Sequence, residues 1–299
     1  AITNFVGPGT KVAVFANGYF CDRMTEMAKR QGASIVRFEK QWGEVFGDAE
    51  ATEFIRKEHP DVVMYVHAET STGALQRGKA ICTAAHESGA IVIADCVTSL
   101  GAMPVNVDET GIDVAYSCTQ KGLSCPPGLA PITVSPRAAQ RLEARRTPCR
   151  SWYFDLALIN DYYITSHRYH HTAPISMFYA LHEALLLCTE EGIENRWERH
   201  RKTHDQFVEG MKQLGLKMHV AAENQIWNLN TPRVPEGVDE AKVRSVLMDE
   251  QGIEIAGGFG PLAGKVFRVG IMGPLATEEG VSFFMQHFAK ALQAGGYQR

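Results

Sequence analysis

The sequence carries no excess of positive charge and no long run of apolar residues. Its formal net charge is −4, so it lacks the basic surface that binds nucleic acids or anionic membranes. Its apolar runs are much shorter than the roughly 20 residues that a membrane-spanning helix needs. The chain also does not open on the charged and then apolar segments of a secretory signal. We therefore expect no nucleic-acid partner and no membrane partner.

A paired-cysteine pattern is absent as well. The chain has seven cysteines, an odd number, and none of them are spaced as Cys-x-x-Cys. Scattered cysteines of this kind are typical of reduced thiols in cytoplasmic proteins. The sequence therefore predicts a cytoplasmic location and no disulfide framework.

Motifs for nucleotides and metals are missing too. No Gly-x-Gly-x-x-Gly occurs, and residues 257–265 fail as a phosphate loop because Phe259 replaces its first glycine and Val266 follows its lysine. The neighbouring His170 and His171 cannot share one face of a regular element, and no third ligand stands at zinc spacing. We expect neither a nucleotide nor a metal.

What the sequence does contain is an alternation of short apolar runs with segments of helical periodicity. Its 299 residues are 45% hydrophobic and 21% charged, as in ordinary globular proteins. The alternation indicates an α/β fold with a parallel sheet. The predicted strands are 11–16, 33–39, 61–67, 90–94, 112–117 and 129–135, and the predicted helices are 17–31, 48–59, 74–88, 137–146 and 174–188.

A smaller α+β domain is predicted to follow a boundary near Glu190, which divides the chain into domains 1–190 and 191–299. A long helix over 193–214 leads into it. Its predicted strands are 224–229, 254–255 and 265–270, and its helices are 239–251 and 277–294. Before the boundary, residues 151–163 are rich in aromatic side chains and are predicted to be buried or to form an interface.

Chemically useful side chains follow two of the predicted strands. The run 90–94 ends at Asp95, and the run 112–117 is followed by Gln120 and Lys121. Ligands in α/β folds bind beyond the carboxyl ends of the strands, so an acid and a lysine are expected at one edge of the sheet. Pyridoxal phosphate enzymes need this pair, because a lysine forms the Schiff base and a carboxylate keeps the pyridine nitrogen protonated.

These residues belong to an ordered series of motifs that resembles the class V (fold-type I) aminotransferases, specifically the alanine–glyoxylate and serine–pyruvate aminotransferase group. The matching motifs run nearly end to end and are NGYF at 17–20, HAETSTG at 67–73, ADCV at 94–97, TQKG at 119–122, CPPG at 125–128, RYHHT at 168–172 and GKVFRVG at 264–270. The resemblance implies a mostly parallel large-domain sheet, a smaller C-terminal α+β domain, and a homodimer with shared active sites.

The resemblance also implies pyridoxal 5′-phosphate as cofactor and a role for each matching residue around its ring. Lys121 forms the internal aldimine and moves the substrate's α-proton, while Asp95 holds the pyridine nitrogen cationic. Phe20 covers the ring, Val97 packs under it, and Thr70 bonds near the ring oxygen. Two readings from residue type alone stay open: Phe20 is a core residue at a helix start, and the hydroxyls near Thr70 cap the helix predicted at 74–88.

Further residues are implied to hold the cofactor phosphate and the substrate. Gln120 lies near the phosphate, and Tyr169 and Thr172 reach the phosphate of the neighbouring subunit. Arg268 holds the substrate carboxylate in a two-bonded fork; a structural ion pair is the alternative role for this arginine. The resemblance gives no secure role to His67 or Glu69.

The implied reaction moves an amino group from a small amino acid, alanine or serine, to a 2-oxo acid, glyoxylate or pyruvate. No glycine-rich turn for the phosphate precedes the strand at 11–16, so we expect a fragment that begins inside the large domain. Three alternatives remain: a catalytically incomplete fragment or structural dimer partner, a kynurenine-type or phosphonate transaminase, and a lyase of the same fold.

Overall fold

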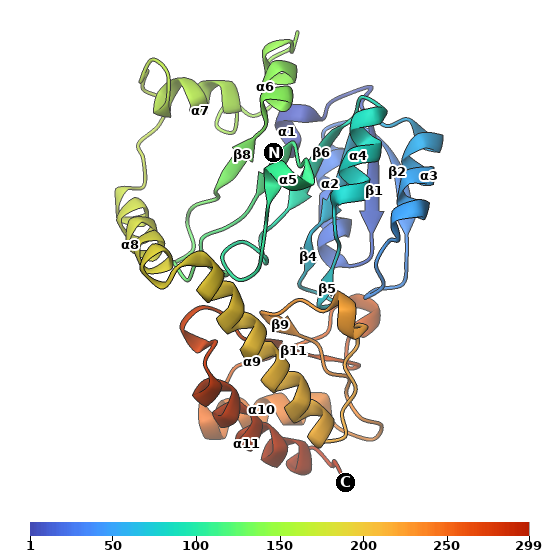
Figure 1. The fold of residues 1–299 in the computed structure, drawn as a ribbon, viewed down its shortest axis with the longest axis vertical. Coiled ribbons are helices and arrows are strands. Elements are labelled where there is room, and N and C mark those ends of the chain that lie inside the picture. The colour runs from blue at the N-terminus through green and yellow to red at the C-terminus, as the bar shows by residue number, and fades with distance from the viewer. Residues whose placement is uncertain (299) are drawn as a thin grey trace.

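A six-stranded sheet forms the centre of the first half of the chain in the computed structural model, which describes residues 1–298 (Figure 1). Its strand order is β2-β1-β3-β6-β7-β8, and all neighbours run parallel except β7 and β8. The strands are β1 (Lys11–Ala16), β2 (Ser34–Glu39), β3 (Val62–Val66), β6 (Ile91–Asp95), β7 (Val114–Tyr116) and β8 (Ile132–Val134). The mostly parallel sheet that the sequence predicts is confirmed.

Helices cover both faces of this sheet because its central strands bury side chains on both sides. In β1, Val12 and Val14 pack on one face, whereas Ala13 and Phe15 pack on the other. The first face is covered by α1 (Ile2–Phe5), α2 (Tyr19–Arg30) and α6 (Pro136–Glu143); the second is covered by α3 (Asp48–Glu58) and α4 (Lys79–Glu87). The short helix α5 (Val107–Thr110) precedes β7.

A second, smaller sheet lies near the C-terminus. Its antiparallel order is β10-β11-β9, formed by β9 (Leu229–Asn230), β10 (Ala256–Gly257) and β11 (Phe267–Gly270). It packs with α10 (Glu240–Gln251) and α11 (Glu278–Ala294) around a core that includes Phe267 and Phe288. Short 3₁₀ helices stand at Ala222–Asn224, Gly260–Leu262 and Gly273–Leu275.

Three helices connect the two sheets. They are α7 (Leu156–Tyr163), α8 (Ile175–Glu191) and the long α9 (Ile193–Gln213), which runs down to the smaller sheet in Figure 1. Gly192 separates α8 from α9 with a φ of +81°, a value that favours glycine. The domain boundary near Glu190 stays a prediction; it is supported by this turn and by the separate hydrophobic cores on either side.

The helix predicted over 74–88 begins later than expected. Ala74 and Leu75 instead form β5 (Ala74–Leu75), which pairs with β4 (Ala68–Glu69), and the helix starts only after Gly78. The hydroxyls of residues 70–72 therefore do not cap it, and that reading is wrong. Tertiary pairing of the hairpin overrides the local helical pattern.

Three other sequence expectations need correction. The strand predicted over 224–229 is limited to Leu229–Asn230, and residues 222–224 form a 3₁₀ helix. The strand predicted over 254–255 lies two residues later, at Ala256–Gly257. In the aromatic segment 151–163, Trp152 and Phe154 are 60% and 59% exposed, so burial within this chain is wrong. Its alternative role as an interface stays a prediction.

Candidate active site

The carboxyl ends of β6 and β7 bring the predicted acid and lysine to one edge of the sheet. Asp95 is the last residue of β6 and stands opposite Tyr116 of β7 in the parallel register. The chain beyond β7 turns tightly, and Ser124 N–H donates to the Lys121 carbonyl at 2.9 Å. This turn keeps Lys121 at the edge where Asp95 ends, as the sequence predicts.

Asp95 is a buried carboxylate whose partners come from its own loop and from the neighbouring strand. Val97 N–H donates to one oxygen at 2.9 Å, and the Tyr116 hydroxyl donates to the other at 2.7 Å. Burial raises the pKa of Asp95, and these two hydrogen bonds and Arg23 partly offset that rise. The Arg23 guanidinium forms an ion pair with Asp95 at 4.0 Å, the long limit for such a contact.

A cavity of about 300 Å³ opens beside this carboxylate. All the residues predicted to surround the cofactor within one subunit line it, namely Phe20, Thr70, Asp95, Val97, Gln120 and Lys121. Phe20 also packs against the sheet core, so its two readings describe different parts of one side chain.

The same cavity contains residues that sequence reasoning missed. Arg23, Thr98 and Cys118 line it, and Tyr116 bonds to Asp95. Arg23 lies one helical turn after Phe20, with its guanidinium 4.6 Å from the centre of the Phe20 ring. This spacing was available in the sequence as an i, i+3 pair. The Tyr116 contact required the register between β6 and β7.

A second cavity, of about 700 Å³, lies on the side of the smaller sheet and contains Arg268. The Arg268 guanidinium lies 4.0 Å from the centre of the Phe259 ring, and its Nε donates to the Gly257 carbonyl at 2.7 Å. Burial lowers the pKa of Arg268, with Glu69 acting in the opposite direction. No ion pair of Arg268 occurs within residues 1–298, and its hydrogen bonds go to the backbone carbonyls of Gly257 and Thr70, which argues against the structural ion pair as its role.

Lys121 lines both cavities. It therefore stands between Asp95 on one side and Arg268 on the other. Its loop is fixed by the buried Arg196 of α9, which donates to the Gly122 carbonyl at 2.7 Å and to the Gly101 carbonyl at 3.0 Å. One guanidinium thus holds together the loop after Asp95 and the loop of Lys121.

Tyr169 and Thr172 are not brought to either cavity of their own chain. Tyr169 is 71% exposed, and its hydroxyl lies 3.1 Å from the Thr172 hydroxyl. Between them His170 is buried, stacked on Trp152 with ring centres 4.1 Å apart. This stacking fixes the loop and leaves the two hydroxyls on its outer side.

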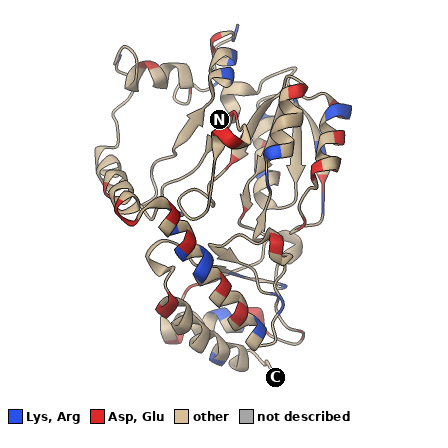
Figure 2. Ribbon diagram, in the orientation of Figure 1, with Lys and Arg blue, Asp and Glu red and all other residues tan. Residues whose placement is uncertain are grey.

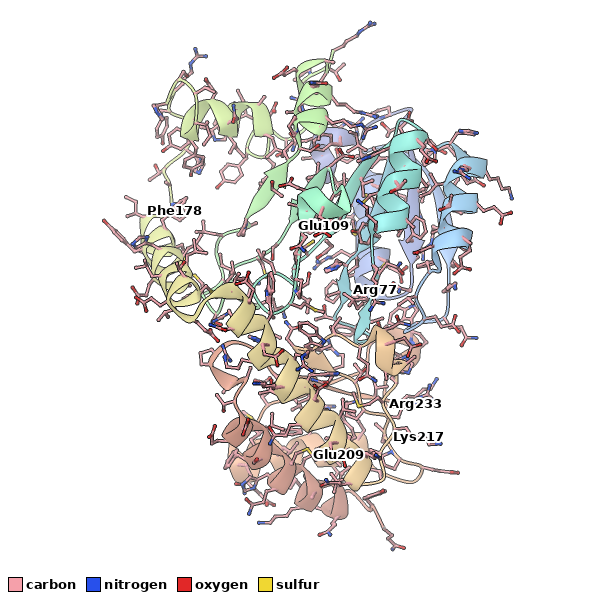
Figure 3. All side chains as sticks on the ribbon, in the orientation of Figure 1. Arg77, Glu109, Phe178, Glu209, Lys217 and Arg233 are labelled. Carbon is pink, nitrogen blue, oxygen red and sulfur yellow. The ribbon has the colours of Figure 1, made fainter. Side chains whose placement is uncertain are left out.

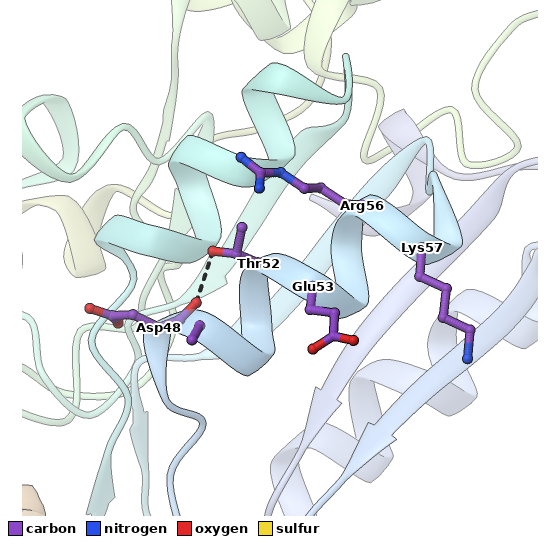
Figure 4. Close-up of a pocket in the computed structure, with 6 residues that line it drawn as sticks. Asp48, Thr52, Glu53, Arg56 and Lys57 are labelled. Carbon is purple, nitrogen blue, oxygen red and sulfur yellow. Dashed lines mark hydrogen bonds between the residues drawn. The ribbon is translucent and has the colours of Figure 1, made fainter.

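A depression along α3 differs from the two cavities above, where side chains from several elements meet. Its lining residues, including Asp48, Thr52 and Arg56, all come from this one helix (Figure 4). Thr52 donates to the backbone carbonyl of Asp48 at 2.8 Å, an ordinary contact within a helix. No second element supplies an opposing group, so we assign it no function.

The side chains that line the smaller cavity fit pyridoxal phosphate. A protonated ring nitrogen would give the buried Asp95 a closer cation than Arg23 at 4.0 Å; Phe20 and Val97 offer apolar surface for a flat ring, and Lys121 offers an amine. For metals, no group of three or more His, Cys, Asp or Glu side chains that could hold an ion exists in residues 1–298. No helix in that range is long and apolar enough to cross a membrane.

Comparison with known proteins extends over almost the whole chain. The family model "Aminotransferase class-V" matches residues 1–282. The (S)-ureidoglycine–glyoxylate transaminase of Bacillus subtilis is 37% identical, with 95% of this chain and 73% of that protein covered. The alanine–glyoxylate aminotransferase of Rattus norvegicus is 33% identical, with 98% and 72% covered.

Solved structures give the same result. The alanine–glyoxylate aminotransferase from Nostoc sp. superposes with a TM-score of 0.95 at 43% identity, with 97% of this chain and 77% of that chain covered. The fold, the position of Lys121 and Asp95 at one edge of the sheet, and the family match all indicate the same family. The chain belongs to the class-V aminotransferases, pyridoxal phosphate-dependent enzymes of fold-type I that transfer amino groups.

Proposed function

We propose that this protein moves an amino group from a small amino acid, such as alanine or serine, to glyoxylate or pyruvate. The observation that carries the proposal is the place of Lys121 in both cavities, with Asp95 on one side and Arg268 on the other. A lysine in that place reaches a cofactor ring bound at Asp95 and an amino acid bound at Arg268.

Each residue then has a distinct task. Pyridoxal phosphate, when bound, draws electrons from the bonds at the substrate's α-carbon. Asp95 keeps a proton on the ring nitrogen, and Thr70 donates near the ring oxygen. Lys121 holds the cofactor and moves the proton at the α-carbon as a general base and acid. Arg268 orients the substrate carboxylate.

The lining of the larger cavity favours small donors. A second arginine, Arg244, also lines this cavity, and the sequence did not indicate it as a residue that could bind a substrate carboxylate. Glu240 neutralises this arginine through contacts of 2.6 and 3.2 Å, so Arg268 is the cation better placed for an added carboxylate. An amino acid with one carboxylate and a short side chain fits this arrangement better than a dicarboxylic acid.

We also propose a homodimer in which Gln120 and the partner's copies of Tyr169 and Thr172 hold the cofactor phosphate. The segment around these hydroxyls exposes many large apolar side chains, which is typical of an interaction surface. They include Trp152, Phe154, Ile175, Phe178, Tyr179 and Leu187. Figure 2 shows few charges along α7 and α8, and Figure 3 labels Phe178 on α8.

We further propose a cytoplasmic location. The seven cysteines are all free thiols, which supports it.

Borohydride reduction of the holoenzyme, followed by peptide mapping, tests the proposal. We expect visible absorbance that reduction removes and a cofactor fixed to Lys121. Lys265, which lies in the matching motif near Arg268 but lines neither cavity, is the internal control. A label on Lys265 would contradict the assignment. Folded protein that takes up no cofactor would favour the alternative of a catalytically incomplete dimer partner.

A further inference from the structure

Glu69 is a buried carboxylate beside the candidate active site, and the proposed function gives this residue no role. It is the last residue of β4, and its side chain is fully inaccessible to solvent. An isolated buried carboxylate is costly, so its hydrogen-bond partners must explain its presence. Its partners here are backbone N–H groups, a hydroxyl and a thiol rather than a cation.

These partners belong mainly to the first turn of α2. One carboxylate oxygen accepts from the backbone N–H of Phe20 at 3.1 Å and of Cys21 at 3.3 Å. The other accepts from the N–H and hydroxyl of Ser71 at 3.0 and 2.7 Å. The Ser71 hydroxyl in turn accepts from the N–H of Tyr19 at 2.9 Å. Glu69 and Ser71 together satisfy the free N–H groups at the start of α2.

The cap comes from a distant segment because the helix has none of its own. Gly18 occupies the N-cap position and has no side chain to accept a hydrogen bond. A Cβ at Gly18 would lie 2.3 Å from the Glu69 Cγ and 2.7 Å from the Ser71 hydroxyl. A glycine is therefore needed for this close approach, and the positive end of the helix dipole adds to the attraction for the carboxylate.

The capped turn carries Phe20 into the smaller cavity, where it faces the same space as Asp95. We propose that Glu69 is a positioning residue: by holding the first turn of α2 from the β4 side, it fixes the Phe20 ring against the bound cofactor. This inference rests on the stacking role of Phe20 in the proposed function. It gives Glu69 and Gly18 a purpose that neither residue type reveals alone.

A double-mutant cycle separates positioning from simple fold stability. The dissociation constant of pyridoxal phosphate from apoprotein is measured by spectroscopic titration for wild type, Glu69→Gln, Phe20→Leu and the double variant. We expect each single variant to weaken binding about five- to tenfold, the scale of an aromatic stacking contact. In the Phe20→Leu background, Glu69→Gln should weaken binding less than twofold. The visible circular dichroism of the bound cofactor should change in both single variants.

Asp113→Asn is the matched control. Asp113 is also a buried carboxylate that accepts from a backbone N–H, that of Val92 at 2.9 Å, and from a serine hydroxyl, that of Ser135 at 2.9 Å, but it does not line the cavity. This variant should lower the melting temperature and leave cofactor affinity unchanged. If Glu69→Gln does not fold, Ser71→Ala replaces it in the cycle, since the Ser71 hydroxyl joins Glu69 to the Tyr19 N–H.

Equal weakening by Glu69→Gln in both backgrounds overturns the inference alone, because Glu69 then acts independently of Phe20. A lower melting temperature with unchanged affinity also overturns it. Unchanged affinity and dichroism in Phe20→Leu alone overturns the stacking role in the proposed function, and the inference with it.

Discussion

The edge of the large sheet and the segment from Trp152 to Leu187 hold their functional side chains in opposite ways. At the edge, Asp95 and Thr70 are buried, each fixed by neighbours from other strands or loops. In the segment, Tyr169 and Thr172 are exposed and contact mainly each other. The side chains at the edge line a cavity of their own chain, whereas Tyr169 and Thr172 line neither of the two cavities.

The difference indicates a division of labour in the proposed homodimer. Residues that tune the chemistry need a dry, preorganised environment, which a folded core provides in advance. Residues that complete the site from a partner must stay on the surface until the partner arrives. The exposed aromatic side chains around Tyr169 are then the cost of keeping that part of the site available.

The sharpest test of this comparison mixes two inactive variants. Lys121→Ala removes the lysine from one subunit, and Tyr169→Phe with Thr172→Ala removes the hydroxyls from the other. If sites are shared, each mixed dimer regains one intact site, so a random equal mixture should recover about a quarter of wild-type activity. Activity is measured after refolding the two variants together and separately. No recovery in confirmed mixed dimers, or a monomer that binds cofactor normally, would contradict shared sites.

A second test targets the buried edge. Asp95→Asn keeps the shape of the side chain but cannot hold a proton on the ring nitrogen. We expect cofactor to bind while turnover falls about 10²- to 10³-fold, since each ~1.4 kcal/mol is a factor of ten. Single-turnover kinetics with alanine or serine measure this loss. Wild-type turnover would show that Asp95 is not the partner of the ring nitrogen.

A third test asks whether Arg268 binds substrate or only supports the fold. Arg268→Lys keeps the charge but loses the planar fork, and each charge-assisted hydrogen bond contributes about 1.5–3 kcal/mol. We expect kcat/KM to fall about tenfold to several hundredfold, with cofactor absorbance and melting temperature nearly unchanged. Arg244→Lys, in the same cavity but paired with Glu240, is the control and should have little effect. Reduced stability with normal kinetics would assign Arg268 to the scaffold.

A fourth test concerns the stability of the fold, which should depend on pH through buried histidines. His200 is fully buried, with Nδ1 2.7 Å from the Arg196 carbonyl and Nε2 accepting from Gly273 N–H at 3.1 Å. Burial lowers the pKa of His200 to about 4, and burial likewise lowers the pKa of His67 to about 4. Between pH 6.5 and 4 the unfolded chain therefore binds more protons than the folded chain.

The contribution of these histidines to stability is thus complete above pH 6.5 and is lost as pH falls towards 4. The slope is at most about 1.4 kcal/mol per pH unit for each histidine. Urea unfolding of wild type and His200→Gln across this range measures it. The variant should show the shallower pH dependence, and identical slopes would show that His200 does not titrate in this way.

Much of this protein was already determined by its sequence. The apolar runs ending at Asp95 and before Lys121 predicted both strands and the edge where they meet, because strand periodicity and burial are local properties. The ordered motifs identified the family and six of the residues that line the smaller cavity. The stretch 74–88 shows the limit, since a distant pairing with β4 replaced the start of a locally favoured helix.

Only the tertiary structure decided which elements share a contact. It placed the Tyr116 hydroxyl on Asp95 through the register of β6 and β7, and it placed Arg244 in the same cavity as Arg268. It also brought Glu69 onto the first turn of α2, 48 residues from Cys21 along the chain. These contacts depend on how separate segments pack, and a buried polar group selects its partners only after that packing exists.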